Sequence, residues 1–109
     1  MIPVSRDAIL TRFCSVLSAF DSKIQAVYLF GSRAKGTERP DSDYDILLVV
    51  SESFSFPDKD KIYDAVMDVL LETGRLISLK IFKKAVFDRL SSMETPFMRH
   101  IHRQGVLIG

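Results

Sequence analysis

Two stretches of the chain place apolar residues three and four positions apart, which is the spacing of a helix with one buried stripe. The first stretch runs from a cap at Ser5 to about Phe20, and the second runs from about Asp58 to Thr73, where Gly74 provides a stop. The stripe of the first consists of Ile9, Phe13, Val16, Leu17 and Phe20. The stripe of the second consists of Ile62, Val66, Val69 and Leu70. Both predict helices that pack one face against a core.

Three other stretches carry the pattern of strands. Ile24–Phe30 and Tyr44–Val50 are short runs rich in apolar and β-branched residues. The second is apolar on both faces beyond Asp45, which is typical of a strand in the centre of a sheet. Leu76–Phe82 alternates instead. Its apolar residues are Ile77, Leu79 and Ile81, and the polar residues between them are Ser78 and Lys80. This predicts a strand with one buried face and one open face.

The remaining segments predict short helices and connections. Gly31–Ser42 begins with a helical turn and continues as an exposed loop. Lys83–Met93 predicts a third helix, and Thr95-Pro96 begins a fourth, with threonine as its cap and proline at its first position. Val106–Ile108 then adds an edge strand or packs as a tail. Strands separated by helices in this order predict an α/β or α+β domain with a small mixed sheet.

Composition narrows the class of protein. The chain has 109 residues, 47% hydrophobic and 27% charged, which predicts one ordinary globular domain over residues 1–109. No run approaches the roughly 20 apolar residues that a membrane span requires, and Met1 does not open a signal sequence. The single cysteine, Cys14, excludes an internal disulfide and is expected to be a packing residue in a reducing cytoplasm.

The net charge of +1 hides an uneven distribution. Residues 37–72 carry ten acidic and three basic side chains, whereas residues 73–109 carry two acidic and seven basic ones. A basic final third can attract RNA or an acidic protein surface. Because it lacks a cluster of aromatic and basic residues, an ordinary solvated surface is the alternative.

The segment with the clearest chemistry is 29–50, LFGSRAKGTERPDSDYDILLVV. Asp43 and Asp45 are two residues apart at the start of a strand, so their side chains project the same way. Two close carboxylates stay ionised only beside a cation, and oxygen ligands favour a hard ion such as Mg²⁺ that shares its shell with substrate phosphates. Gly31 lets the backbone approach phosphates, and Ser32 adds a hydroxyl beside a helix N-terminus. Singly, each feature is an ordinary turn or loop end, but together they predict nucleotidyl transfer.

Three basic residues are candidate nucleotide ligands. Arg33 and Lys35 directly follow the Gly-Ser pair, where contact with phosphates is expected. Lys80 lies on the open face of its predicted strand and can bind a triphosphate as a point charge. The alternative for all three is a solvated surface. His100 and His102 are two residues apart on a predicted helix, so they face different ways and are not expected to chelate one ion.

The segments GSRAKG and SDYDILLVV resemble the signature of the DNA polymerase β-type nucleotidyltransferase superfamily. At this size the chain looks most like the minimal nucleotidyltransferase domains of prokaryotes, which are often encoded beside a HEPN-domain partner as a toxin–antitoxin pair. The resemblance implies a sheet with helices packed on one face and the site on the other. It also implies that Gly31 and Ser32 bind the nucleotide phosphates and that Asp43 and Asp45 hold Mg²⁺.

One position departs from that pattern. Members of the superfamily usually place a third carboxylate on the strand after the D-x-D strand, whereas this chain has Ser78 there and then Lys80. One carboxylate fewer weakens the hold on a second metal ion. Loss of a general base typically costs a factor of about a hundred to ten thousand in rate, so the enzyme is expected to be slow rather than inactive. Glu72, or a group from a partner chain, is a candidate substitute.

Two functional hypotheses follow. The first is a Mg²⁺-dependent nucleotidyltransferase that transfers AMP from ATP to a hydroxyl of a separate protein or RNA, with a HEPN-type protein as the leading partner by family analogy. The second is an antitoxin-like or nucleotide-binding protein that acts by binding its partner, its transferase activity weakened by Ser78. A plain RNA-binding module is a third alternative, and an oligomeric assembly stays open.

Overall fold

The computed structural model describes residues 7–20, 22–31 and 43–108. Its elements, in chain order, are α1 (Ala8–Leu17), the 3₁₀ turn η2 (Ser18–Phe20), β1 (Ile24–Phe30), β2 (Tyr44–Val50), α3 (Phe56–Thr73), β3 (Ile77–Lys83), α4 (Lys84–Ser92), α5 (Pro96–Gln104) and β4 (Val106–Leu107). The predicted loop between the first two strands, like the predicted cap Ser5, lies outside the described residues. The architecture is the α+β domain with a small mixed sheet that the sequence predicts.

The four strands form one sheet in the order β3-β2-β1-β4. β1 pairs antiparallel with β2 and with β4, whereas β2 and β3 run parallel. β2 is therefore an internal strand, which confirms the central position predicted from its continuous apolar run. In the register, Asp45 lies opposite Phe30 of β1 on one side and beside Ser78 of β3 on the other.

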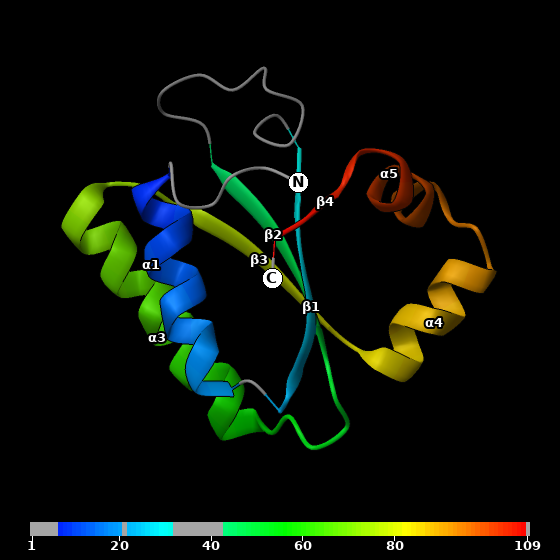
Figure 1. Ribbon diagram of the computed structural model, residues 1–109, viewed down its shortest axis with the longest axis horizontal. Helices are drawn as coiled ribbons and strands as arrows, with labels where there is room; N and C mark the ends of the chain where they lie inside the picture. The colour runs from blue at the N-terminus through cyan, green and yellow to red at the C-terminus, as the bar shows by residue number, and fades with distance from the viewer. Residues whose placement is uncertain (1–6, 21, 32–42, 109) are drawn as a thin grey trace.

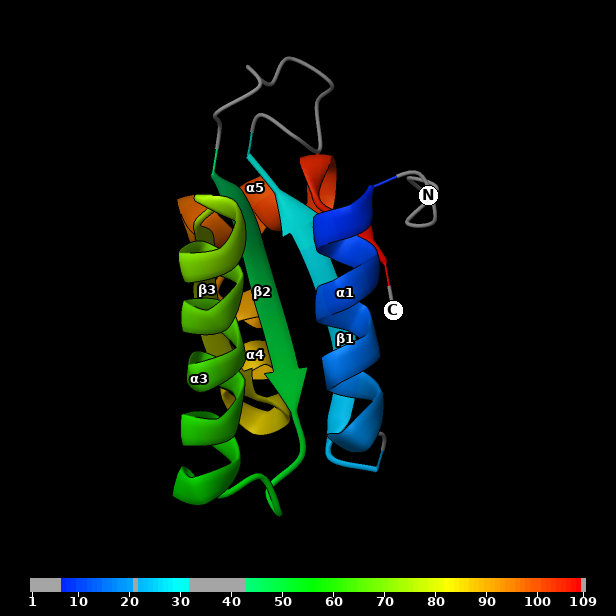
Figure 2. The same ribbon diagram turned by 90° about the vertical axis from the view of Figure 1, so that its left-hand side faces the viewer.

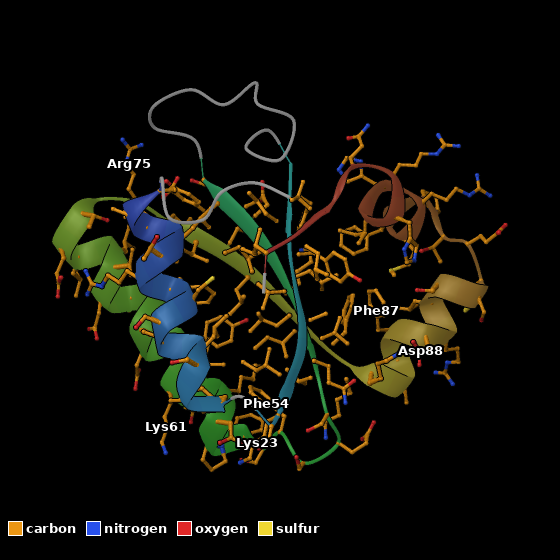
Figure 3. All side chains as sticks on the ribbon, in the orientation of Figure 1. Lys23, Phe54, Lys61, Arg75, Phe87 and Asp88 are labelled. Carbon is orange, nitrogen blue, oxygen red and sulfur yellow. The ribbon has the colours of Figure 1, made fainter. Side chains whose placement is uncertain are left out.

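One face of the sheet is covered by α1 and α3, which lie side by side, with α1 nearer β1 and α3 nearer β3 (Figures 1 and 2). Alternate residues of β2 point into this layer. They pack with the buried stripes of both helices, and the main members are Ile46, Leu48, Val50, Leu10, Phe13, Leu17, Ile62, Val66 and Val69. Figure 3 shows Phe54 at the end of the same layer.

The opposite face of the sheet carries α4 and α5 (Figure 1). A second cluster there consists of Leu47, Val49, Phe87, Met98 and Ile101, and Figure 3 shows Phe87 on α4. The prediction of helices on one face therefore holds for the two long helices and misses the two short ones. The physical reason lies in β2, because a strand that is apolar on both faces needs cover on both.

Both long helices begin at a different residue from the one predicted. Asp7 caps α1, because its Oδ1 accepts hydrogen bonds from the backbone N–H of Ile9 and of Leu10 at 2.9 and 3.1 Å. Ser55 caps α3 in a capping box with Asp58, so the helix starts two residues before the expected position.

The predicted stripe of α1 was also incomplete, since Leu10 is buried while Val16 is only half-buried.

The predictions for the C-terminal elements are confirmed. Thr95 Oγ1 accepts from the backbone N–H of Met98, Pro96 opens α5, and β4 pairs along the edge of β1. Cys14 is half-buried against the core, and burial raises the pKa of its thiol, as expected of a packing residue. Among the described residues, no helix is both long and apolar enough to cross a membrane.

Candidate active site

Gly31 and the carboxylate of Asp45 meet where β1 ends. Phe30, the last residue of β1, is paired with Asp45, so the next residue follows directly alongside the carboxylate. Gly31 has φ +75°, a conformation that residues with a side chain rarely adopt. A Cβ at Gly31 would lie 2.3 Å from Asp45 Oδ2. The carboxylate therefore occupies the space that any other residue would need, and glycine is required here for two independent reasons.

Asp43 and Lys80 both act electrostatically on Asp45. Asp43 is exposed just before β2, and Asp45 is half-buried inside it. The pKa of Asp45 is raised, first by burial and then by the charge of Asp43, while the charge of Lys80 lowers it. The two carboxylates are therefore a repelling pair whose ionisation a cation would favour.

The donor set of this pair fits a hard cation. Two carboxylates are what Mg²⁺ commonly takes from a protein when water and substrate phosphates complete its shell. Among the residues that the structure describes, no group of three His, Cys, Asp or Glu side chains could hold a metal ion. Asp43 and Asp45 stay the candidate ligands predicted from the sequence, and a pair of carboxylates suits an ion that shares its shell with a nucleotide.

Ser78 occupies the place beside Asp45 on the neighbouring strand. The two residues are direct partners in the parallel β2–β3 ladder, and paired residues of parallel strands point to the same face. Ser78 is half-buried, whereas Lys80, the next residue on this face, is exposed. The third position of the site thus holds a neutral hydroxyl, as the sequence predicts.

Glu72 does not replace the missing carboxylate. Its Oε2 lies 2.6 Å from Arg12 Nη1, in an ion pair that joins α3 to α1. The hydrogen bond and charge of Arg12 lower the pKa of Glu72. Because α1 and α3 cover the face of the sheet opposite to Asp45, the proposed substitution by Glu72 is wrong.

An aromatic cluster lies on the same face as Asp45. Phe97 of α5 meets Phe30 and Phe82 edge to face, at 5.7 and 6.3 Å between ring centroids. These rings are not among the site residues predicted from the sequence. The signal was present, because Phe82 follows Lys80 by two residues on one strand and therefore shares its face.

The structure describes only some of the other candidate residues. Ser32, Arg33 and Lys35 lie outside the described residues, so their contact with phosphates stays a prediction. His100 meets the ring of Phe30 while His102 Nε2 lies 3.1 Å from Ser91 Oγ, which confirms that the two histidines are not a chelating pair.

The chain matches a protein family whose chemistry fits this candidate site. Residues 15–109 match the family model described as Polymerase beta, Nucleotidyltransferase. The chain therefore belongs to the polymerase β-type nucleotidyltransferases, and it is an enzyme of that class.

Two kinds of curated relative support the assignment. A protein of Methanocaldococcus jannaschii, named provisionally as a protein adenylyltransferase, is 33% identical over 84 residues, which are 77% of this chain and 78% of the relative. A spectinomycin 9-adenylyltransferase of Staphylococcus aureus is 34% identical over 74 residues, which are 68% of this chain but only 28% of that enzyme.

Solved structures share the fold. A toxin–antitoxin crystal structure with AMP-PNP has a TM-score of 0.56 and 20% identity, over 89% of this chain and 69% of that one. A variant of the MntA–HpeT toxin–antitoxin has a TM-score of 0.59 and 20% identity, over 91% and 70% of the two chains.

Proposed function

We propose that this protein transfers AMP from ATP to a hydroxyl group of a separate protein or RNA, with Mg²⁺ held by Asp43 and Asp45. The observation that carries the proposal is the contact between Gly31 and Asp45. A backbone without a side chain and a carboxylate share one small space at the start of β2. A triphosphate and its metal ion need these two surfaces side by side. The adenylyltransferase names of the relatives support AMP as the transferred group.

Each residue has a role in this proposal. Gly31 lets the polyphosphate approach the backbone, together with Ser32, Arg33 and Lys35 if their predicted contacts hold. Lys80 lies near enough to Asp45 to influence its ionisation, and it offsets phosphate charge. When bound, Mg²⁺ supplies charge neutralisation at the transferred phosphoryl group.

The reaction balances without a cofactor beyond the ion. A bond forms between the acceptor oxygen and the α-phosphorus, the bond from the α-phosphorus to the bridging oxygen breaks, and pyrophosphate leaves. The proton of the acceptor hydroxyl passes to solvent, because β3 carries Ser78 where a carboxylate would take it. Positioning and charge neutralisation remain, so we expect slow but metal-dependent transfer.

The partner is a HEPN-type protein in this proposal. The toxin–antitoxin structures that share the fold support a protein partner. Ser78 favours a second candidate function at the same site. An antitoxin-like protein would neutralise its partner by binding alone, with nucleotide bound but seldom transferred.

Two measurements separate these functions. ATP labelled at the α-phosphate is incubated with Mg²⁺, the protein and a HEPN-type protein encoded beside it. Label that appears on the partner and disappears with Asp43→Ala supports the enzyme. Neutralisation of the partner that survives Asp43→Ala combined with Asp45→Ala supports the binder. Independently of any partner, calorimetry should detect ATP uptake that Mg²⁺ strengthens and Asp45→Ala abolishes, and uptake indifferent to Mg²⁺ would contradict both functions.

A further inference from the structure

The outer edge of β3 has backbone groups that no strand pairs among residues 7–20, 22–31 and 43–108. On its inner side, Leu76 O accepts a hydrogen bond from Tyr44 N. Backbone groups of successive residues alternate in direction along a strand, so the outward set is that of Ile77, Leu79 and Ile81. Tyr63 confirms this direction, because its hydroxyl donates to Leu79 O at 3.4 Å from α3. Such an edge is a template for an additional strand.

An exposed apolar stripe of α3 borders this edge. Its members are spaced by four or seven residues and are Phe56, Tyr63, Met67 and Leu71. Phe56 is 75% exposed and Met67 is 51% exposed. Tyr63, through its contact with Leu79, fixes the flank of the helix on which the stripe lies. Apolar side chains gathered in this way on a surface are typical of a protein-binding site.

Two cavities lie between the stripe and the edge. The first has a volume of about 450 Å³ and lies among Lys59 of α3, Lys80 of β3 and Phe97 of α5. The second has a volume of about 320 Å³, shares Lys59 with the first and extends to Lys83. Ile81 lines both. Successive cavities along a strand edge suit alternate side chains of an extended peptide.

The lining of the first cavity is positively charged. Lys59 and Lys80 line it, and the described residues of its lining include no acid, whereas Lys83 at the second cavity is 3.8 Å from Glu52 Oε2. The carboxylate of Glu72 lies on the other flank of α3 and pairs with Arg12 of α1. Asp68 acts on the same arginine, so it also belongs to the flank beside α1. Asp60 and Asp64 lie three residues before Tyr63 and Met67, so they neighbour the stripe. The positive charge that an occupant meets is therefore that of Lys59 and Lys80 at the first cavity.

We propose that the edge of β3 and the stripe of α3, together called the β3 groove, bind an extended acidic segment of a partner protein. The segment adds to the sheet as a strand beside β3, places large apolar side chains in the two cavities and sets its acids against the lysines. Lys80 belongs to both the groove and the candidate active site, so the docked partner lies next to Asp45. The inference rests on the proposed function only in taking the partner to be a protein.

A second copy of this chain suits the groove less well. Lys80 is the middle residue of β3, so two edges paired about a two-fold axis there would place the two Lys80 side chains opposite each other. Like charges directly opposite on neighbouring strands are destabilising. Charge therefore disfavours self-association in that register, and a dimer in any other register is an outcome of the test below.

The test uses the whole chain without nucleotide. A display library of random peptides about nine residues long, enough to span β3, is selected against the protein. We expect enriched sequences in which acids alternate with large apolar residues. A labelled enriched peptide should bind about tenfold more weakly to Met67→Glu, which adds an acid to the groove. Met93→Glu makes the same change at the residue that follows α4, which is 63% exposed, and it should leave affinity unchanged.

Amide resonances provide the structural readout, and those of Leu79 and Ile81 should shift when the peptide binds. The proposal is overturned by a selection without acidic enrichment, by equal effects of Met67→Glu and Met93→Glu, or by a dimer in sedimentation that Met67→Glu dissolves. The two proposals fail separately. Peptide binding without Mg²⁺-assisted ATP uptake would count against the proposed function alone, and ATP uptake without peptide selection would count against the groove alone.

Discussion

The sharpest prediction concerns Gly31→Ala, because the structure supplies a matched control for it. Gly31 and Gly74 both have a left-handed backbone, with φ +75° and +73°. Alanine in that conformation costs roughly 1–2 kcal/mol at either position. At Gly74, which ends α3, a Cβ meets no atom within 4 Å, so backbone strain is the whole effect. At Gly31 the Cβ also collides with the Asp45 carboxylate.

The size of that collision sets the expected loss of activity. The Cβ would lie 2.3 Å from Asp45 Oδ2, and real contacts of this kind are essentially never under 3.0 Å. The difference of 0.7 Å is the least distance by which the carboxylate must move. Displacement of a reacting group by about 1 Å can cost a factor of about a hundred in rate. Gly31→Ala should therefore lower AMP transfer by roughly that factor, whereas Gly74→Ala should leave it unchanged.

Two assays check this prediction. Urea unfolding followed by circular dichroism should show a loss of roughly 1–2 kcal/mol for Gly74→Ala and at least as large a loss for Gly31→Ala, with both variants still folded. Labelled-ATP transfer by the folded variants should then separate them. Equal activity of Gly31→Ala and Gly74→Ala would refute the argument that the close approach to Asp45 positions the reaction. Loss of activity in both would show instead that global destabilisation is responsible.

Three further predictions follow from the site and the caps. Ser78→Asp should raise Mg²⁺-dependent transfer, by up to the factor of about a hundred to ten thousand that a general base commonly supplies, and an unchanged single-turnover rate would show that β3 has no such role. Asp45→Asn should raise the melting temperature of the nucleotide-free protein at neutral pH, because the raised pKa of Asp45 means that folding disfavours its charged form; a lower melting temperature would contradict this. Asp58, whose pKa is lowered from 3.8 to about 2 by the backbone of Ser55 and by Lys23, should stabilise the fold above pH 3.8 and lose that contribution as the pH falls to about 2. Unfolding of wild type and Asp58→Asn should therefore differ at pH 7 and converge near pH 2, and a constant difference would refute the assignment.

The strands at the site could be predicted from the sequence because their signals are local. β1 and β2 have the predicted bounds, since each is a short run rich in apolar and β-favouring residues. The burial of Tyr44, which lies between two acids that point the other way, followed from alternation along the strand. Its hydroxyl donates to Asp7 Oδ2 at 2.8 Å, a tertiary contact that the sequence could not indicate.

The errors arise where tertiary contacts decide between equivalent local signals. Ser5 and Asp7 are both good helix caps two residues apart, and Asp7 is the one that caps α1. Glu72 is close to β3 in sequence, yet the turn of α3 places it beside Arg12. The order of the strands and the cover on the second face are likewise properties of packing rather than of any short segment.

The two clusters on either side of β2 have a consequence for the nascent chain. The carboxylates stand at the start of β2, but half of the apolar cover of that strand comes from α4 and α5, and β4 closes the free edge of β1. A ribosome must therefore release residues 84–108 before the strand that bears Asp45 is enclosed on both faces. Until then the polypeptide has the acids without the apolar layer that encloses their strand, so catalytic competence is acquired only after residues 84–108 have emerged.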